Sequence, residues 1–426
     1  MSYDKSIHLS EKPKSVKQNM VWNSAGSLIY YGLQWLITVL IVRLSSGYDA
    51  AGQLSLAMAI AQIFTPFALF RIRAFQISDV KGEYSTGEYV GFRIFTIGVS
   101  FVLITIYMFL TCDLSTIPVI FLYVVYKSIE VFIDVLHGLD QKKERMDYIG
   151  ISLILRGFLS FISFCGVLFL FNNLAFAVLS MIVWTLLICI IYDWQKAKKL
   201  DALTPKINKA LFISLSKRCF PAVIAAFFCI AAPSLPKQYL AYMCGDTALG
   251  IYSSINNPAI IIQVGATYIY SPLLVSFSKL FNTHKTREFQ QQFVKVFLGI
   301  LALSVFCAII FLIFGKNLLV LFYGESIIPY EYLLQPALIC TFFTALVWLL
   351  ADLLIVVRNL KGNLLGNLAA FLITIPAGLY FINNFDMLGV SFSIIASYGI
   401  AIIVLVIFLL NSLRLKQNPG DSELIS

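Results

Sequence analysis

The sequence predicts an all-α integral membrane protein with about 12 transmembrane helices, arranged as two parallel-repeat six-helix lobes around a central cavity. Three observations predict this fold class. The 426 residues are 59% hydrophobic and 12% charged, with a mean hydropathy of +0.86, whereas an average soluble domain is about 25% charged. The apolar residues form long unbroken blocks, which indicates helices because membrane-spanning strands give short alternating segments. The Lys and Arg residues fall almost entirely on one side of the predicted membrane.

Each predicted span is an apolar block of about 20 residues, the length that carries a helix across about 30 Å of hydrocarbon. A helix suits this solvent because it pairs its backbone polar groups internally. The eighth block is longer and contains Pro258 and Pro272, so we expect it to be kinked or partly interfacial. The predicted spans are residues 21–43, 52–70, 90–111, 117–137, 148–171, 174–194, 219–241, 249–277, 291–314, 334–357, 363–382 and 388–411.

The loop charges predict the orientation. With both termini in the cytoplasm, 24 of the 31 Lys and Arg lie on the cytoplasmic side and only Arg43 and Lys316 lie outside. This is the bias that the positive-inside rule describes. It also explains the net charge of +9 by topology, so we expect no nucleic-acid partner. Because the first 20 residues are polar and the first apolar block has full spanning length, we expect no cleavable signal peptide.

A Lys-rich segment at 195–218 separates six predicted spans from six. Two halves with an even number of spans have the same orientation, so a repeat would be parallel, as in several transporter folds. Gly52-Gln-Leu-Ser55 opens span 2 and Gly250-Ile-Tyr-Ser253 opens span 8, which favours a weak internal repeat. The predicted parts are a cytoplasmic tail (1–20), a first lobe (21–210), a second lobe (211–411) and a second cytoplasmic tail (412–426).

Several kinds of chemistry have no support in the sequence. The eight cysteines are scattered without a CxxC pair, and the three histidines are far apart, so we predict no metal site. No phosphate-binding GxxxxGK[ST] pattern occurs, and the extramembrane segments are too short for a nucleotide-binding domain. We therefore expect no cofactor and no enzymatic activity.

Charges inside the predicted spans are informative, because a charged side chain at the bilayer centre costs about 2.5–3.5 kcal/mol. The basic residues outnumber the acidic ones, which favours an anionic ligand or a water-filled cavity. We expect the two basic residues nearest the span ends, Arg93 and Lys295, to reach the membrane surface. The embedded basic residues are Arg93, Lys127, Arg156, Lys237 and Lys295, and the acidic ones are Glu130, Asp134 and Asp352.

The fourth span carries the most telling pattern. Lys127, Glu130, Asp134 and His137 are spaced to share one helix face, and Lys127 lies about 16 Å deep by helix rise. Arg156 on the next, antiparallel span lies at a depth of about 12 Å, similar to that of Glu130, so we predict a pair between these two.

Two interpretations of these charges stay open. The Glu130–Arg156 pair either holds two helices together or contributes to a ligand site. We expect Lys127 to face a ligand, because the acidic residues nearest to it on the same helix are expected to pair with other residues. Asp352 either binds a proton or Na⁺ or faces a water-filled cleft.

Three stretches carry a resemblance to a known family. They are Arg73–Tyr84 with Tyr89 and Arg93, Glu130–Gly157, and Pro236–Ser253 with its Pro-Lys pair at 236–237. They resemble Wzx-type flippases of the polysaccharide transporter family, within the multidrug/oligosaccharidyl-lipid/polysaccharide (MOP) superfamily. The resemblance covers the whole chain in topology and is clearest in residues over about 50–160 and 236–255.

The resemblance implies a flippase of the bacterial cytoplasmic membrane. It would move undecaprenyl-diphosphate-linked oligosaccharide repeat units to the outer leaflet by alternating access, for O-antigen or other surface polysaccharide. It would act as a monomer, with a polymerase and a chain-length regulator as partners. The implied diphosphate-binding residues are Arg73, Arg93, Lys127, Arg156 and Lys237, and the acids that could couple transport to H⁺ or Na⁺ are Glu130, Asp134 and Asp352.

Two alternatives remain. An ion-coupled multidrug or small-molecule exporter of the same superfamily would need an acidic cavity for cationic drugs, whereas the embedded charge here is net positive. A membrane-embedded polymerase would carry a large outside loop and an acyltransferase a membrane histidine. The only candidate histidine, His137, lies at the cytoplasmic end of its predicted span.

Overall fold

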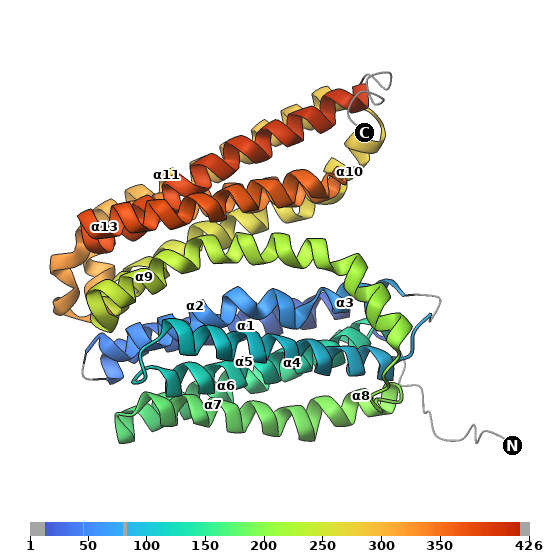
Figure 1. Ribbon diagram of the computed structural model, residues 1–426, viewed down its shortest axis with the longest axis horizontal. Helices are drawn as coiled ribbons and strands as arrows, with labels where there is room; N and C mark the ends of the chain where they lie inside the picture. The colour runs from blue at the N-terminus through green and yellow to red at the C-terminus, as the bar shows by residue number, and fades with distance from the viewer. Residues whose placement is uncertain (1–12, 46, 80–82, 418–426) are drawn as a thin grey trace, which may run out of the picture. The chain divides into compact units, whose positions relative to one another are not determined.

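The computed structural model describes residues 13–45, 47–79 and 83–417, and these residues form helices and turns (Figure 1). The helices are α1 (Val16–Leu44), α2 (Asp49–Leu69), α3 (Ile72–Ser78), α4 (Thr86–Thr111), α5 (Ile117–Lys142), α6 (Met146–Phe171), α7 (Leu174–Ile188), the π-helical turn η1 (Cys189–Asp193), α8 (Trp194–Leu200), α9 (Lys209–Tyr270), the 3₁₀ turn η2 (Ser271–Leu273), α10 (Leu274–Asn282), α11 (Thr286–Tyr323), the 3₁₀ segment η3 (Glu325–Leu333), α12 (Leu334–Val356) and α13 (Leu360–Gln417).

All 12 predicted spans are present among the described helices. Nine helical stretches are long and apolar enough to cross a membrane, and two of them, those containing α9 and α13, each hold two spans. The spans in α9 are separated at Gly245 (φ 82°) and those in α13 at Asp386 (φ 46°), where the backbone is not helical. The twelfth span is α5, whose embedded charges distinguish it from the apolar helices. The expected break in span 8 is only partly present: α9 remains helical through Pro258 and ends at Tyr270, before Pro272.

The chain divides into two compact units, Met1–Val223 and Ile224–Ser426. The boundary lies within α9, so the long helix starts in the first unit and continues in the second. The sequence placed the boundary earlier, between residues 210 and 211. In the structure the first turns of α9 pack with the first unit, since Leu215 belongs to the same buried cluster as Ile72 and Phe92.

In unit 1, α1 lies along α6, α6 packs on α7, and α5 packs against α2 and α7. Small residues allow the closest of these approaches. A Cβ atom added at Gly26 of α1 would come within 2.6 Å of the Gly150 Cα atom of α6. This close packing of helix backbones through glycine is typical of helices in membranes.

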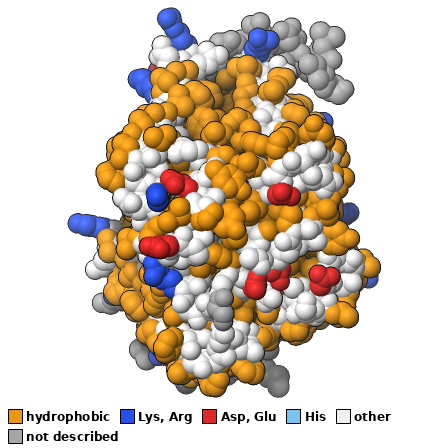
Figure 2. All heavy atoms as spheres, turned by 90° about the vertical axis from the view of Figure 1, so that its left-hand side faces the viewer, with side chains coloured by type: hydrophobic (Ala, Val, Ile, Leu, Met, Phe, Trp, Pro, Cys, Tyr) orange, Lys and Arg blue, Asp and Glu red, His pale blue; other side chains and the backbone are white. Residues whose placement is uncertain are grey.

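The end of unit 1 predicted to be cytoplasmic is tied together by the linker before α9. Its backbone pairs with α4, where the Lys206 N–H donates to the Gly87 carbonyl at 2.9 Å. Ser85 and Glu88 form a capping box that starts α4. Figure 2 shows the opposite end of the helices, where hydrophobic and uncharged side chains cover most of the face and charged ones are few.

In unit 2, α12 packs against α13 and α11, and α10 packs against α11 and α12. Large apolar side chains are exposed along the outer faces of both units, including Leu110, Leu312 and Ile403. In lipid such side chains have an apolar solvent, so their exposure suits a membrane protein.

Candidate functional site

The first candidate site is a polar cluster around Glu130 in unit 1. The Lys127 Nζ atom lies 2.6 Å from Glu130 Oε2, and Arg156 Nη1 of α6 lies 3.5 Å from Glu130 Oε1. The Tyr126 hydroxyl donates to Oε1 at 3.3 Å, and the Tyr30 hydroxyl of α1 donates to the same oxygen. We call these five residues the Glu130 cluster. It contains the predicted Glu130–Arg156 pair.

The sequence predicts that Lys127 faces a ligand, and the structure also gives it a protein partner. Lys127 pairs with Glu130 because the two are three residues apart on one helix face. Its other candidate partner, Asp134, is occupied by two arginines. The Lys127 side chain is still 33% exposed, whereas that of Arg156 is 5% exposed. Lys127 is therefore the more accessible of the two cations.

Aromatic rings surround the two cations of the Glu130 cluster. The Lys127 Nζ atom lies 5.4 Å from the centre of the Tyr126 ring and 5.8 Å from that of Tyr123, and the Arg156 guanidinium lies 5.3 Å from the Tyr30 ring. The face of an aromatic ring carries partial negative charge and attracts a cation placed over it. With two cations for one carboxylate, the cluster carries excess positive charge in an apolar setting.

A second cluster is built around Asp134, one turn further along α5. Arg73 of α3 contacts Asp134 Oδ1 at 3.1 Å through Nη1, and Arg93 of α4 contacts Oδ2 at 2.7 Å through Nη2. Arg73 also donates to the Gln141 side chain at 2.9 Å. One carboxylate therefore joins three helices at the end of unit 1 predicted to be cytoplasmic.

The expectation that Arg93 reaches the membrane surface is wrong, because its side chain is fully buried. Its Nη1 atom donates to the carbonyls of Ala68 and Leu69 at 2.8 and 2.7 Å. These carbonyls lie at the C-terminal end of α2, where the last turn of a helix leaves acceptors free and favours a cation. Arg93 is therefore an anchor between α2, α4 and α5.

Two predicted residues lie in unit 2. Lys237 on α9 forms no hydrogen bond or ion pair within residues 13–45, 47–79 and 83–417, although it is partly buried. Asp352 on α12 accepts a hydrogen bond from the Tyr270 hydroxyl of α9 at 3.1 Å. The structure thus joins six of the eight predicted site residues into two clusters of unit 1, and it gives Asp352 a tyrosine partner in unit 2.

The sequence reasoning missed the two tyrosines of the Glu130 cluster. Tyr126 is four residues from Glu130 on the same helix face, so a helical spacing pattern could have found it. Tyr30 lies 100 residues away on α1, and no local pattern links it to α5. The close approach of α1 and α6 at Gly26 and Gly150 brings α1 to the cluster.

Asp79, directly after α3, contacts the residues that precede α4. Burial acts to raise the pKa of this carboxyl, but the Glu83 and Tyr84 backbone N–H groups donate to it at 2.8 and 3.2 Å. With Lys142 Nζ at 3.6 Å and the Tyr89 hydroxyl at 3.2 Å, they hold the pKa of Asp79 below its ordinary value. The carboxylate thereby links the end of α3 to residues 83–84, to α4 and to α5.

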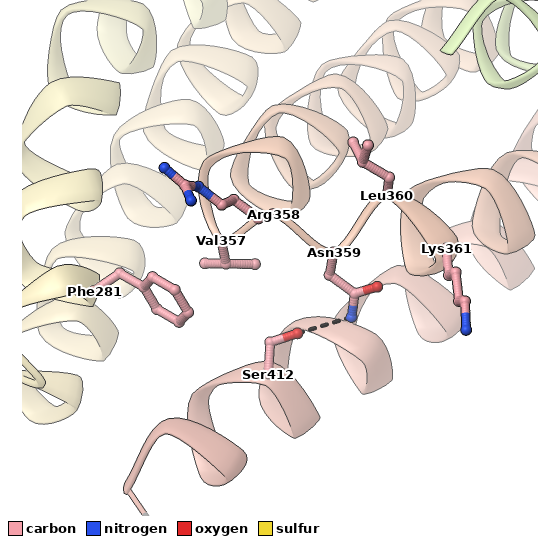
Figure 3. Close-up of a pocket in the computed structure, with 7 residues that line it drawn as sticks. All are labelled: Phe281, Val357, Arg358, Asn359, Leu360, Lys361 and Ser412. Atoms are coloured by element: carbon pink, nitrogen blue, oxygen red, sulfur yellow. Dashed lines mark hydrogen bonds between the residues drawn. The ribbon is translucent and has the colours of Figure 1, made fainter. Parts of the chain in front are cut away.

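Unit 2 has an open groove of about 490 Å³ at its end predicted to be cytoplasmic (Figure 3). In Figure 3 the Asn359 side chain bonds to Ser412 of α13 at 2.8 Å, and Phe281 of α10 faces the turn between α12 and α13. Arg358 and Lys361 give this groove positive charge. A second groove, of about 390 Å³, lies between α4, α5 and α7 of unit 1 and is almost entirely apolar, with Phe101, Phe132 and Trp194 in its wall.

The comparisons with known proteins define the family. A family model described as "Polysaccharide biosynthesis protein" matches residues 16–281, which is more than half of the chain. The chain belongs to this polysaccharide biosynthesis protein family. It is also 29% identical over 309 residues to the "Capsular polysaccharide biosynthesis protein CapF" of Staphylococcus aureus, covering 69% of this chain and 74% of that protein.

Solved structures of MOP transporters share the fold of this family member. An inward-facing multidrug resistance MATE transporter matches with a TM-score of 0.74 at 10% identity, over 94% of this chain and 100% of that chain. The Vibrio cholerae MATE transporter VcmN matches with a TM-score of 0.62 at 13% identity, over 93% and 96%. A Pyrococcus furiosus MOP transporter, whose title reports a reversed polarity of the binding pocket, matches with 0.58 at 14% identity, over 98% and 100%.

These matches confirm two predictions from the sequence. The first is membership of a polysaccharide biosynthesis family, which the resemblance implied, and the second is the all-α membrane fold of 12 helices in two lobes. The protein is therefore a multi-pass membrane protein with a transporter fold, in a family of polysaccharide biosynthesis. At these identities the solved structures show the fold alone.

Proposed function

We propose that this protein is a flippase for undecaprenyl-diphosphate-linked oligosaccharide repeat units. It translocates them from the cytoplasmic to the outer leaflet of the bacterial cytoplasmic membrane by alternating access, for surface polysaccharide. A lipid diphosphate needs such a carrier, because moving its charged head and its sugars into hydrocarbon costs too much free energy to occur unaided. Family membership and the transporter fold support the proposal.

The observation that carries the proposal is the excess positive charge of the Glu130 cluster. Lys127 and Arg156 share one carboxylate, and the buried Arg156 Nε atom has no hydrogen-bond partner in the described residues. A diphosphate could accept charge-assisted hydrogen bonds from both cations. Because Lys127 is partly exposed, it can exchange Glu130 for a phosphate oxygen without unfolding the cluster.

The same charge argues against the exporter alternative. A carrier of cationic drugs needs acidic groups free to meet them, whereas Glu130 and Asp134 each contact two basic side chains. The proposal includes both termini in the cytoplasm, a monomer, and a polymerase and a chain-length regulator as partners. Coupling to H⁺ or Na⁺ remains part of this proposal.

The test is translocation by the purified protein in liposomes. The substrate is lipid-linked oligosaccharide extracted from cells that lack the protein, and its transfer is followed with a membrane-impermeant sugar-oxidising reagent. We expect the protein to make inner-leaflet substrate accessible to the reagent, and Lys127→Ala to lower the rate at least tenfold by removing the exposed cation.

Lys295→Ala is the matched control, because Lys295 is also a lysine within a predicted span but lies exposed on α11. We expect this variant to keep the wild-type rate. Equal rates for Lys127→Ala and wild type would show that the Glu130 cluster does not bind substrate. No transfer by the wild type above empty liposomes would contradict the flippase proposal itself.

A further inference from the structure

A third group of buried titratable side chains lies outside the clusters described above, where α5 and α6 meet η1 in unit 1. It consists of His137 and Asp140 on α5 and Asp193 on η1, and we call it the His137 group. The relative exposures of these residues are 4%, 1% and 2%. Both α5 and α6 pack against η1.

Four side-chain polar atoms of the His137 group are buried without a hydrogen-bond partner in the described part of the chain. The His137 Nε2 atom lies 3.4 Å from Asp193 Oδ1 without hydrogen-bonding alignment. Asp140 Oδ1, Asp193 Oδ2 and the nearby Tyr148 and Tyr192 hydroxyls are also buried and unsatisfied. Unsatisfied buried polar atoms are rare because they cost free energy, so this concentration of them marks a candidate binding site.

The charges around the His137 group leave its two carboxylates without a Lys or Arg partner in the described residues, and the basic side chain beside them is His137, 3.4 Å from Asp193. Arg145 neutralises the neighbouring Asp147 through two hydrogen bonds of 2.9 Å. Within the described residues, no ion pair joins Asp140 or Asp193 to a Lys or Arg. The charged and titratable groups around the His137 group are Arg73 on α3, Arg145 before α6, Asp147, Tyr148 and Arg156 on α6, Cys189 and Tyr192 on η1, and Lys196 on α8.

We propose that the His137 group is a proton-binding site that exchanges a proton with the end of unit 1 predicted to be cytoplasmic. Two ionised carboxylates with one histidine and no Lys or Arg partner are costly in a buried site, so one of them takes up a proton. The proton binds a carboxylate oxygen of Asp140 or Asp193, a hydronium ion becomes water, and no other reactant is consumed. Because the three groups interact, the proton belongs to the group rather than to one residue.

The surroundings favour a proton over a metal ion or Na⁺. No group of three or more His, Cys, Asp or Glu in the described residues has the arrangement of a metal site. A proton needs no coordination shell, and chains of Asp, Glu and His serve as proton relays in membrane proteins.

The position of the His137 group links its protonation to the helices that carry the Glu130 cluster. His137 is two helical turns from Glu130 on α5, and Asp193 ends a π-helical turn, a feature that often marks functional sites. Neutralising a carboxylate here changes the charge at the junction of α5, α6 and α7–α8. This consequence for transport rests on the proposed flippase function, whereas proton binding does not.

The test is an infrared pH titration of the purified protein in liposomes, between about pH 5 and about pH 8, where histidine-linked groups titrate. A protonated carboxylic acid has a carbonyl band separate from that of a carboxylate. We expect the wild type to lose such a band as the pH rises, and Asp140→Asn and Asp193→Asn each to lose at least half of the change. Asp113→Asn, at an exposed carboxylate between α4 and α5, should leave the band unchanged.

His137→Gln keeps both carboxylates and tests the same site if the Asn variants fail to fold. We expect it to shift the midpoint of the band by at least a factor of ten in proton concentration. An unchanged titration in His137→Gln, or the same change in wild type and both Asn variants, would overturn the proposal. A midpoint that moves tenfold when K⁺ is replaced by Na⁺ would also overturn it, in favour of a cation site. Because no substrate is present, the result is separate from that of the transport assay.

Discussion

At the residue scale, basic side chains in unit 1 serve two different purposes. Arg93 is fully buried and its guanidinium contacts Asp134 and two backbone carbonyls, so its role is to hold helices together. Lys127 is partly exposed and shares Glu130 with Arg156, so its charge is accessible. The sequence predicted that both are embedded, and it predicted the Glu130–Arg156 pair from helix spacing. It could not predict the partners of Arg93, because Ala68 lies 25 residues away at the end of another helix.

Asp134 gives a stability prediction at this scale. Replacing it with Ala leaves the buried Arg93 guanidinium without its carboxylate, and breaking a buried ion pair in this way costs about 3–5 kcal/mol. We expect a clearly lower thermal unfolding temperature in detergent for Asp134→Ala. Asp113→Ala, which removes an exposed carboxylate, should unfold like the wild type. Equal unfolding temperatures for the two variants would mean that the Asp134 cluster does not hold unit 1 together.

Asp79 gives a pH prediction. Its pKa lies below the ordinary value of 3.8, so its ionised form stabilises the fold above that pH and the contribution is lost as the pH falls through the folded pKa. We therefore expect Asp79→Asn to lower the thermal stability at neutral pH. The difference from the wild type should shrink toward zero in acid. A difference that grows in acid would contradict the hydrogen bonds assigned to the Asp79 carboxylate.

At the element scale, the sequence predicted every span, and the structure shows how sharply two pairs of spans are divided. The apolar blocks on either side of Gly245 and of Asp386 are separate spans in the sequence, and in the structure a single non-helical residue divides the two helices at each of these positions. Gly245 fits such a position because a positive φ is open to glycine, whereas proline at 258 is accommodated within the helix. Proline alone was therefore a poor guide to the break.

The packing of α1 on α6 gives a prediction for this scale. At Gly150 an added Cβ would meet the backbone of Trp22, which cannot move away as a flexible side chain would. We expect Gly150→Leu to push α1 from α6 and to prevent recovery of a monodisperse protein in size-exclusion chromatography. Gly166→Leu on the same helix meets nothing within 4 Å and is the control. Normal behaviour of both variants would be inconsistent with the α1–α6 contact.

At the scale of the whole molecule, composition and loop charge predicted the class of protein, and the comparisons confirmed the family and the fold. The hydrophobic effect and the cost of embedded charge act on every residue, so they leave a strong pattern in a single sequence. The Glu130 cluster needed three helices, α1, α5 and α6, to come together. Only its α5 residues share a helical spacing, which is why the tyrosine from α1 escaped prediction.

The flippase account is tested most directly by the sidedness of lipid-linked oligosaccharides in cells that lack the protein. If the account holds, complete repeat units on the prenyl diphosphate accumulate facing the cytoplasm, and surface polymer is lost. The wild-type gene should restore both, and a Lys127→Ala gene that gives normal protein levels should not. If complete units instead appear normally on the outer face, or if the units are incomplete, the protein acts at another step and the flippase account is wrong.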